Sequence, residues 1–189
     1  MSYETMSYEV EQKFPVDDFR AIEQALRSLG VEIGRAEEEV DRYFNHPAHD
    51  FRESDEALRI RRKGTANRIT YKGPRVDQTT KTRREIELPL PDGDDVPRQW
   101  QGLLETLGFS PFNEVRKRRR KVQIDWQGRA VVGTLDEVDG LGTFVELELI
   151  AEEADLDDAR ACIASLAERL ELHQSERRSY LRLLLDKRR

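Results

Sequence analysis

The feature that most constrains the fold is a recurring segment in which two glutamates alternate with apolar residues, followed by a helix-like pattern. The glutamate pairs are Glu9 and Glu11, Glu85 and Glu87, and Glu146 and Glu148. Alternate side chains of a strand share a face, so each pair projects one way and its apolar neighbours project the other. Neighbouring carboxylates repel, so such a face is either well solvated or organised around a cation.

Each glutamate pair precedes a segment with helical spacing of apolar residues, and Gly30 and Gly108 end the first two such segments. Further strands are predicted between these units from alternation and β-branched or aromatic residues, at 36–46, 57–63, 67–73, 114–124 and 129–138. Together with the glutamate segments they make about eight strands, and their unequal spacing excludes a regular solenoid.

The charged residues of these strands also alternate with apolar ones. Arg59 and Arg61 share a face opposite Leu58 and Ile60, and Asp136 lies opposite Leu135; the other predicted strands follow the same rule. One such strand ordinarily belongs to a sheet that packs its apolar face on helices and exposes its charged face to water. Eight of them tend to curl or close, and apolar faces that pack on outer helices leave the charged faces inside.

The prediction is therefore an α+β fold: a closed eight-stranded antiparallel β-barrel with helices packed outside and a lumen that carries charges of both signs. Lumenal lysines and arginines call for a polyanion, and clustered glutamates call for a divalent cation. A metal-bound polyphosphate satisfies both. We expect one domain over residues 6–189, with a final helix near its end, and regard the repeated "MSYE" at the start as leaving 1–5 outside the fold.

Composition limits the partners. The net charge of −6 argues against general nucleic-acid binding, although "RKRRRK" at 116–121 is locally basic. The single Cys162 cannot form an internal disulfide, and a chain without one suits a reducing compartment. Cys162 is expected in the core.

No apolar run reaches membrane-spanning length, so we expect a cytoplasmic protein without membrane contact. His46 and His49 could hold zinc, but no further ligand has motif spacing, and a solvated loop is preferred.

"EVEQK" at 9–13 resembles the E-x-E-x-K signature of the CYTH superfamily, the triphosphate-tunnel metalloenzymes. The resemblance continues in order through "DRYFNHPAHDFRESDEALRIRR", "YKGP", "TKTRREIE", "VRKRRR", "LDEVDGLGTFVELE" and "RRSYLRLL". The "YFNHPAHDF" stretch and "DEALRIR" are most similar to the class IV adenylyl cyclases; thiamine triphosphatases and inorganic tripolyphosphatases belong to the same superfamily. The known fold of the family is an eight-stranded antiparallel barrel, which agrees with the strand count.

The resemblance implies a role for each charged position. Mg²⁺ or Mn²⁺ would be held by the metal ligands Glu9, Glu11, Glu146 and Glu148. The substrate would be bound by Lys13, Arg59, Arg61, Lys72, Lys117, Arg119 and Glu85. The catalytic group would comprise Lys13, Asp136 and Glu87. In the basic strand, a slip of one residue would exchange Lys117 and Arg119 for Arg116, Arg118 and Arg120.

Three functions remain open from the sequence. The subgroup resemblance favours a class IV adenylyl cyclase-like enzyme, in which the ribose 3′-hydroxyl of ATP attacks the α-phosphate and releases pyrophosphate. A triphosphatase would use the same metal-binding and substrate-binding residues. In such an enzyme, water attacks the terminal phosphate of tripolyphosphate, thiamine triphosphate or a nucleoside triphosphate. A polyphosphate- or nucleotide-binding module without turnover is the third. The expected partner is a small-molecule triphosphate, and a homodimer is compatible with the sequence.

Overall fold

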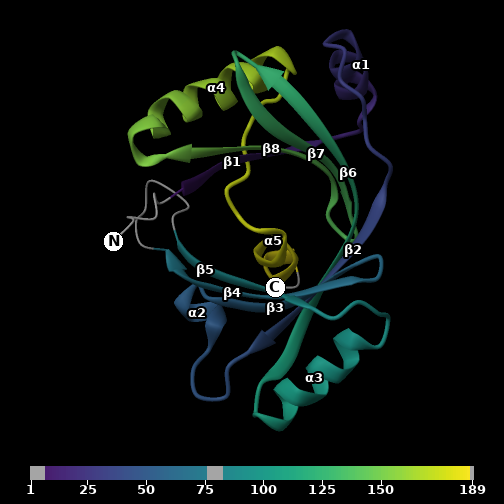
Figure 1. Ribbon diagram of the computed structural model, residues 1–189, viewed down its shortest axis with the longest axis vertical. Coiled ribbons are helices and arrows are strands. Elements are labelled where there is room, and N and C mark those ends of the chain that lie inside the picture. Colours follow the sequence, from purple (N-terminus) through teal and green to yellow (C-terminus); the bar gives the residue numbers. More distant parts are fainter. Residues whose placement is uncertain (1–6, 76–82, 188–189) are drawn as a thin grey trace. The chain divides into compact units, whose positions relative to one another are not determined.

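The structure is a computed structural model, and it describes residues 7–75 and 83–187. Residues 1–5, expected to lie outside the fold, are not among those described. The strands are β1 Ser7–Val16, β2 Glu37–Asn45, β3 Ala57–Lys63, β4 Ala66–Arg75, β5 Arg83–Leu90, β6 Ser110–Trp126, β7 Arg129–Val138 and β8 Gly142–Glu152. The helices are α1 Arg20–Ser28, α2 Phe51–Ser54, α3 Val96–Thr106, α4 Leu156–Arg169 and α5 Tyr180–Lys187, with a 3₁₀ turn η1 at Glu153–Asp155 (Figure 1).

The chain forms two compact units, and each is assembled from segments that are distant in sequence. The first unit contains residues up to 36 and residues 119–179, which carry β1, α1, the second half of β6, β7, β8 and α4. The second unit contains residues 37–118 and the segment from 180 onward, which carry β2 to β5, the first half of β6, and helices α2, α3 and α5.

The strands follow the order β1-β8-β7-β6-β2-β3-β4-β5. The ladders β1–β8 and β7–β8 in the first unit are antiparallel, and so are β2–β3, β3–β4 and β4–β5 in the second. The turn between β6 and β7 has positive φ at both Gln127 (53°) and Gly128 (74°), the backbone of the tight turn that suits a twisted hairpin. The expected turn glycine Gly64 is likewise left-handed, with φ 57°.

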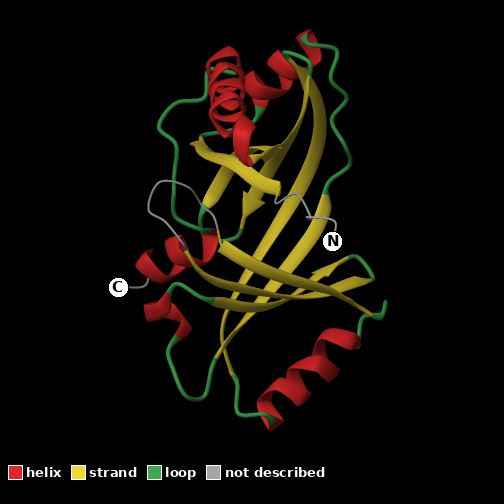
Figure 2. Cartoon of the chain, turned by 60° about the vertical axis from the view of Figure 1, so that its left-hand side comes forward, coloured by secondary structure: helices red, strands yellow, loops and turns green. Residues whose placement is uncertain are grey.

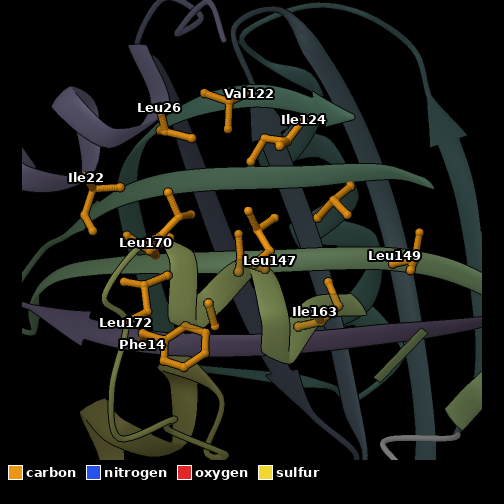
Figure 3. Packing of buried hydrophobic residues seen from close by; sticks show 14 of the residues in the cluster. Phe14, Ile22, Leu26, Val122, Ile124, Leu147, Leu149, Ile163, Leu170 and Leu172 are labelled. Atoms are coloured by element: carbon orange, nitrogen blue, oxygen red, sulfur yellow. The ribbon is translucent and has the colours of Figure 1, made fainter. Parts of the chain in front are cut away.

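The first unit has its hydrophobic core on one face of its strands. Val145, Leu147 and Leu149 of β8 point into this core, where Ile163 and other residues of α4 cover them (Figure 3). α1 contributes Ile22 and Leu26 to the same cluster. Cys162 is buried there as well, which confirms its expected place in the core, and burial raises the pKa of its thiol. The helices therefore cover the apolar face and leave the charged residues of the strands on the other.

The second unit has a smaller core of the same construction. Phe44 of β2 and Leu58 and Ile60 of β3 are buried on one face, against Val96 and Leu104 of α3. The short helix α2, which the sequence did not predict, adds the buried Phe51; Asp50 begins this helix by accepting a hydrogen bond from the Arg52 amide. Figure 2 shows the helices in red and the strands in yellow.

The predicted α+β class and the eight antiparallel strands are confirmed, but the closure of the barrel is not. In the described residues β1 and β5 are the two ends of the strand order, and no ladder joins them. The alternation of a strand determines which side chains share a face. Closure depends instead on backbone hydrogen bonds between the two end strands, which alternation does not encode.

Candidate active site

The charged face of the first unit is built by β1, β8, β7 and the second half of β6. Glu9, Glu11 and Lys13 alternate along β1, and Lys13 is directly opposite Glu146 on β8. Thr134 on β7 is opposite Glu146 from the other side. This row of three, Lys13–Glu146–Thr134, crosses three adjacent strands on one face.

Two glutamates are cross-strand partners in the neighbouring row of this face. Glu11 of β1 is the direct cross-strand partner of Glu148 of β8. Like charges in opposed positions destabilise a ladder, so this pair is one that a cation would relieve. Mg²⁺ is commonly bound through one or two carboxylates together with substrate phosphates, and these oxygen donors fit it or Mn²⁺. Among the described residues, no group of three or more His, Cys, Asp and Glu side chains is close enough to hold a metal ion.

Glu146 lies in a network of ion pairs. One of its oxygens is 3.9 Å from Lys13 Nζ, and the other accepts a hydrogen bond from Arg119 Nη2. Arg119 also donates from Nε to Asp136 Oδ1 over 2.7 Å, and from Nη2 to the other oxygen of that carboxylate. Lys13 is 3 % exposed and Asp136 is fully buried, so these charges compensate one another away from water. A metal ion bound by Glu146 would compete with these ion pairs for its oxygens.

The charged face of the second unit is centred on two buried acids of β2. Asp41 accepts hydrogen bonds from Arg61 Nε (2.6 Å) and Nη2 (2.7 Å) and from Arg59 Nη1 (3.4 Å). Glu39 lies 3.2 Å from Lys117 Nζ and 3.7 Å from Arg61 Nη1. Each acid thus holds two of the three cations, which sets the guanidinium and ammonium groups side by side.

The pKa values of these groups follow from their burial and their partners. Burial alone would raise the pKa of the Asp41 carboxyl, but Arg59, Arg61 and Lys117 outweigh it and hold that pKa below its usual range. Burial would lower the pKa of Arg61, and its bonds to Asp41 raise it instead. Asp41 and Arg61 therefore stay charged at neutral pH.

A second set of pairs lies on the same face, along β4 and β5. Lys72 Nζ is 2.7 Å from Glu85 Oε2. Arg68 donates to Glu87 Oε1 over 2.5 Å, and Thr70 donates to the other oxygen of Glu87 over 3.2 Å. Although burial opposes it, these two bonds lower the pKa of Glu87. Glu85 and Glu87 therefore neutralise neighbouring cations and lie at the more exposed margin of the face.

The structure resolves the orientation of the basic strand β6. Lys117 (4 % exposed) and Arg119 (12 %) lie on the charged faces. Arg116 is half-exposed and pairs with Glu114, and Arg120 pairs with Glu23 of α1 over 2.7 Å. The strand therefore has the orientation that was predicted, and the alternative with a slip of one residue is excluded.

Several polar groups of these faces were not identified from the sequence. On β2 they are Glu39, Asp41 and the buried Tyr43, which is the cross-strand partner of Arg59. The alternation of 37–45 carried the signal, because Val40 and Phe44 occupy the other parity and are buried in the core. Thr134 on β7 and Asn113 on β6 are also buried polar residues, and a neutral residue within a charged strand gives no such signal.

His46 and His49, the two histidines considered as zinc ligands, lie in the loop between β2 and α2. Their rings are 4.5 Å apart, between centroids. His46 Nδ1 accepts a hydrogen bond from the Ala48 amide, and His49 Nε2 is 2.9 Å from Glu56 Oε2. Their observed partners are thus local ones. Within the described residues, no helix has the length and apolar character needed to span a membrane.

The chain is similar to proteins of a known family. The family model of the CYTH domain matches residues 7–180. A protein of Methanocaldococcus jannaschii named "Putative adenylate cyclase MJ0240" is 39% identical over 140 residues, which are 74% of this chain and 75% of that protein.

Solved structures of similar fold include PH1819 from Pyrococcus horikoshii, with 39% identity, a TM-score of 0.80, and coverage of 95% of this chain and 99% of that one. A more distant structure, described as a "putative adenylyl cyclase" from Hippeastrum with a dominant triphosphatase activity, has 16% identity and a TM-score of 0.66, with coverage of 96% of each chain. That likeness concerns the fold alone. On the family match and the archaeal relative, the chain belongs to the CYTH domain family.

Proposed function

We propose that this protein is a divalent-cation-dependent enzyme that acts on a triphosphate. The observation that carries the proposal is the cluster of the buried Lys117 and the partly buried Arg59 and Arg61, held side by side by Glu39 and Asp41. Adjacent buried cations are costly unless they bind anions, and a chain of phosphates offers closely spaced anionic oxygens. The opposed carboxylates Glu11 and Glu148 would hold Mg²⁺ or Mn²⁺, which supplies charge neutralisation to phosphates when bound.

Within this proposal, Arg59 is the cation best prepared to bind substrate. Its contact with Asp41 is long, at 3.4 Å, while Arg61 holds the same carboxylate through two short bonds. Arg59 Nε is buried and has no hydrogen-bond partner among the residues described. A phosphate oxygen would satisfy this donor with a charge-assisted hydrogen bond.

The first candidate reaction is conversion of ATP to cyclic AMP and pyrophosphate. The name of the Methanocaldococcus relative, which is 39% identical, favours it. In the first unit, Lys13 and Arg119 would neutralise charge on the phosphates, and Asp136 would hold Arg119 in place. In the second unit, Glu87 would hold Arg68.

The second candidate is hydrolysis of tripolyphosphate, thiamine triphosphate or a nucleoside triphosphate. What favours it is the character of the second unit's charged face, where phosphate-binding groups predominate and Tyr43, the aromatic ring beside Arg59, is 8 % exposed. A face of this kind offers more contacts to phosphates than to the base of a nucleotide.

One assay separates these candidates. Purified protein is supplied with ATP, tripolyphosphate or thiamine triphosphate, each with Mg²⁺ or Mn²⁺, and the products are resolved. Cyclic AMP with pyrophosphate identifies a cyclase, and orthophosphate identifies a triphosphatase. Binding without any product would contradict an enzymatic role and would favour a polyphosphate- or nucleotide-binding module without turnover.

Arg59→Gln and Arg62→Gln are the matched variants for this assay. Both residues are on β3, but Arg62 projects to the opposite side and pairs with Asp94 over 3.4 Å. We expect Arg59→Gln to lower kcat/KM on the order of 10- to 100-fold, because it removes a hydrogen bond to a charged group. Arg62→Gln should match the wild type. Equal effects of the two substitutions would contradict the assigned site.

A further inference from the structure

The buried hydroxyl of Thr134 makes no hydrogen bond in the part of the chain that the structure describes. The side chain lies on the charged face of β7 and is 3 % exposed. Its Oγ1 is buried and has no hydrogen-bond partner within residues 7–75 and 83–187. An unsatisfied buried hydroxyl costs stability, so its retention calls for a state in which it is bonded.

The neighbour best placed to bond this hydroxyl is Glu146. The two residues are direct cross-strand partners in the β7–β8 ladder. Side chains in such positions have Cβ atoms about 4.5–5.5 Å apart, which is within the reach of a hydroxyl and a glutamate carboxylate. In the structure this bond is not made, and Lys13 and Arg119 engage the two oxygens of Glu146 instead.

A bound triphosphate would change that competition. Its oxygens would compete with Glu146 for Lys13 and Arg119, since phosphate oxygens are strong acceptors for both cations. The Glu146 carboxylate would then lose one or both ion pairs and could turn toward the metal. A ligating carboxylate needs a hydrogen-bond donor to orient it, and Thr134 is the donor opposite.

We infer that Thr134 is a positioning residue: in the ligand-bound state its hydroxyl donates to the Glu146 carboxylate and orients it toward the divalent cation. This inference rests on the proposed function, since it needs a triphosphate to release Glu146. It also gives a reason why a hydroxyl with no partner is kept in the row that Lys13 and Glu146 form.

The test compares Thr134→Val with Thr134→Ser in three measurements. The first is the melting temperature without ligand, the second is the dissociation constant of Mn²⁺ in the presence of tripolyphosphate, and the third is the dissociation constant of tripolyphosphate in EDTA. Valine keeps the branched shape and removes the unsatisfied hydroxyl, so the ligand-free melting temperature should stay the same or rise.

The Mn²⁺ dissociation constant of Thr134→Val should increase on the order of 10- to 100-fold, as for other lost partners of a metal-ligating side chain. Thr134→Ser should restore most of the affinity. Tripolyphosphate binding in EDTA should stay within about twofold of the wild type, since the hydroxyl acts through Glu146 and the metal.

Thr143→Val is the matched control, because this hydroxyl on β8 is already bonded. Thr143 Oγ1 donates to the Val16 carbonyl over 2.5 Å. Its loss should lower the ligand-free melting temperature and leave the Mn²⁺ dissociation constant unchanged, the reverse of the result expected for Thr134→Val.

Three results would overturn the inference. They are wild-type Mn²⁺ affinity in Thr134→Val, a clear fall in its ligand-free melting temperature, or an equal loss of tripolyphosphate binding in EDTA, which would place the hydroxyl on the phosphate. Wild-type protein that binds tripolyphosphate under no condition would instead overturn the proposed function, and Thr134 with it.

Discussion

Asp41 is the single residue on which the cations of the second unit most depend. It is almost completely buried and holds Arg59 and Arg61 directly. Removal of one member of a buried ion-pair network leaves the others uncompensated, and that costs far more than the net worth of the pair. The Asp41 carboxylate therefore both stabilises the fold and fixes the positions of the two arginines proposed to bind phosphate.

Asp41→Asn should destabilise the protein by about 3–5 kcal/mol at pH 7, because two guanidinium groups lose their buried counter-charge. The pKa of Asp41 is lowered in the folded state, so its contribution is present above the unfolded-state pKa of about 3.9 and is lost as the pH falls below that value. Urea unfolding at pH 7 and at pH 3 should show a smaller difference between variant and wild type at pH 3. Asp94→Asn, at an exposed ion pair with Arg62, should change stability by less than about 0.5 kcal/mol at either pH; an effect as large as that of Asp41→Asn would contradict this assignment.

At the scale of elements, the close packing of β7 against β6 aligns the charged residues of the first unit. Gly133 lies next to Thr134 but faces the core, where a Cβ atom would come within 2.6 Å of Val122 Cγ2 and 3.3 Å of Ile124 Cδ1. The absence of a side chain there is what lets the two strands keep the spacing that brings Arg119 to Asp136.

Gly133→Ala should therefore cost about 1–3 kcal/mol through overpacking. For a chain of this length, that corresponds to a melting temperature lower by about 2–12 °C. Gly102→Ala on α3 is the control: apart from its chain neighbours and the nearby backbone of its own helix, no atom of the described residues lies within 4 Å of its Cβ position, and alanine should stabilise the helix by up to about 1 kcal/mol. Calorimetric melting distinguishes the two, and a Gly133→Ala protein as stable as the wild type would refute the packing explanation.

The cross-strand pair Glu11 and Glu148 is expected to act as a unit in metal binding, and melting temperatures can test this. Mn²⁺ with tripolyphosphate should raise the melting temperature of the wild type, and Glu11→Gln or Glu148→Gln should each remove most of that rise. If the two carboxylates share one ion, the double variant should be scarcely worse than either single variant. Additive losses would show that they do not. Glu168→Gln, at an exposed position of α4, should respond like the wild type.

At the scale of the whole molecule, alternation and helical periodicity predicted most of the fold. Segments 57–63 and 129–138 coincide with β3 and β7, and all four expected helices are present. The helix α2 was not predicted, since one helical turn has too few residues to show a period.

The candidate site could be predicted only in part, for physical reasons. The alternation of charged and apolar residues along β3 predicted that Arg59 and Arg61 share one face, because Leu58 and Ile60 are buried on the other. It did not reveal that Asp41 and Glu39 would bind these cations, because cross-strand partners depend on register, which lies outside a single strand. The same limit hid Thr134, whose importance arises only from its position opposite Glu146.

The most direct test of the account is a crystal structure of the protein with Mn²⁺ and tripolyphosphate, in which the anomalous signal of manganese locates the ion. The account predicts Mn²⁺ bound to Glu11 and Glu148, and phosphate oxygens within hydrogen-bond distance of Arg59, Arg61 and Lys117. Manganese bound away from both glutamates, or tripolyphosphate bound away from these three cations, would contradict it.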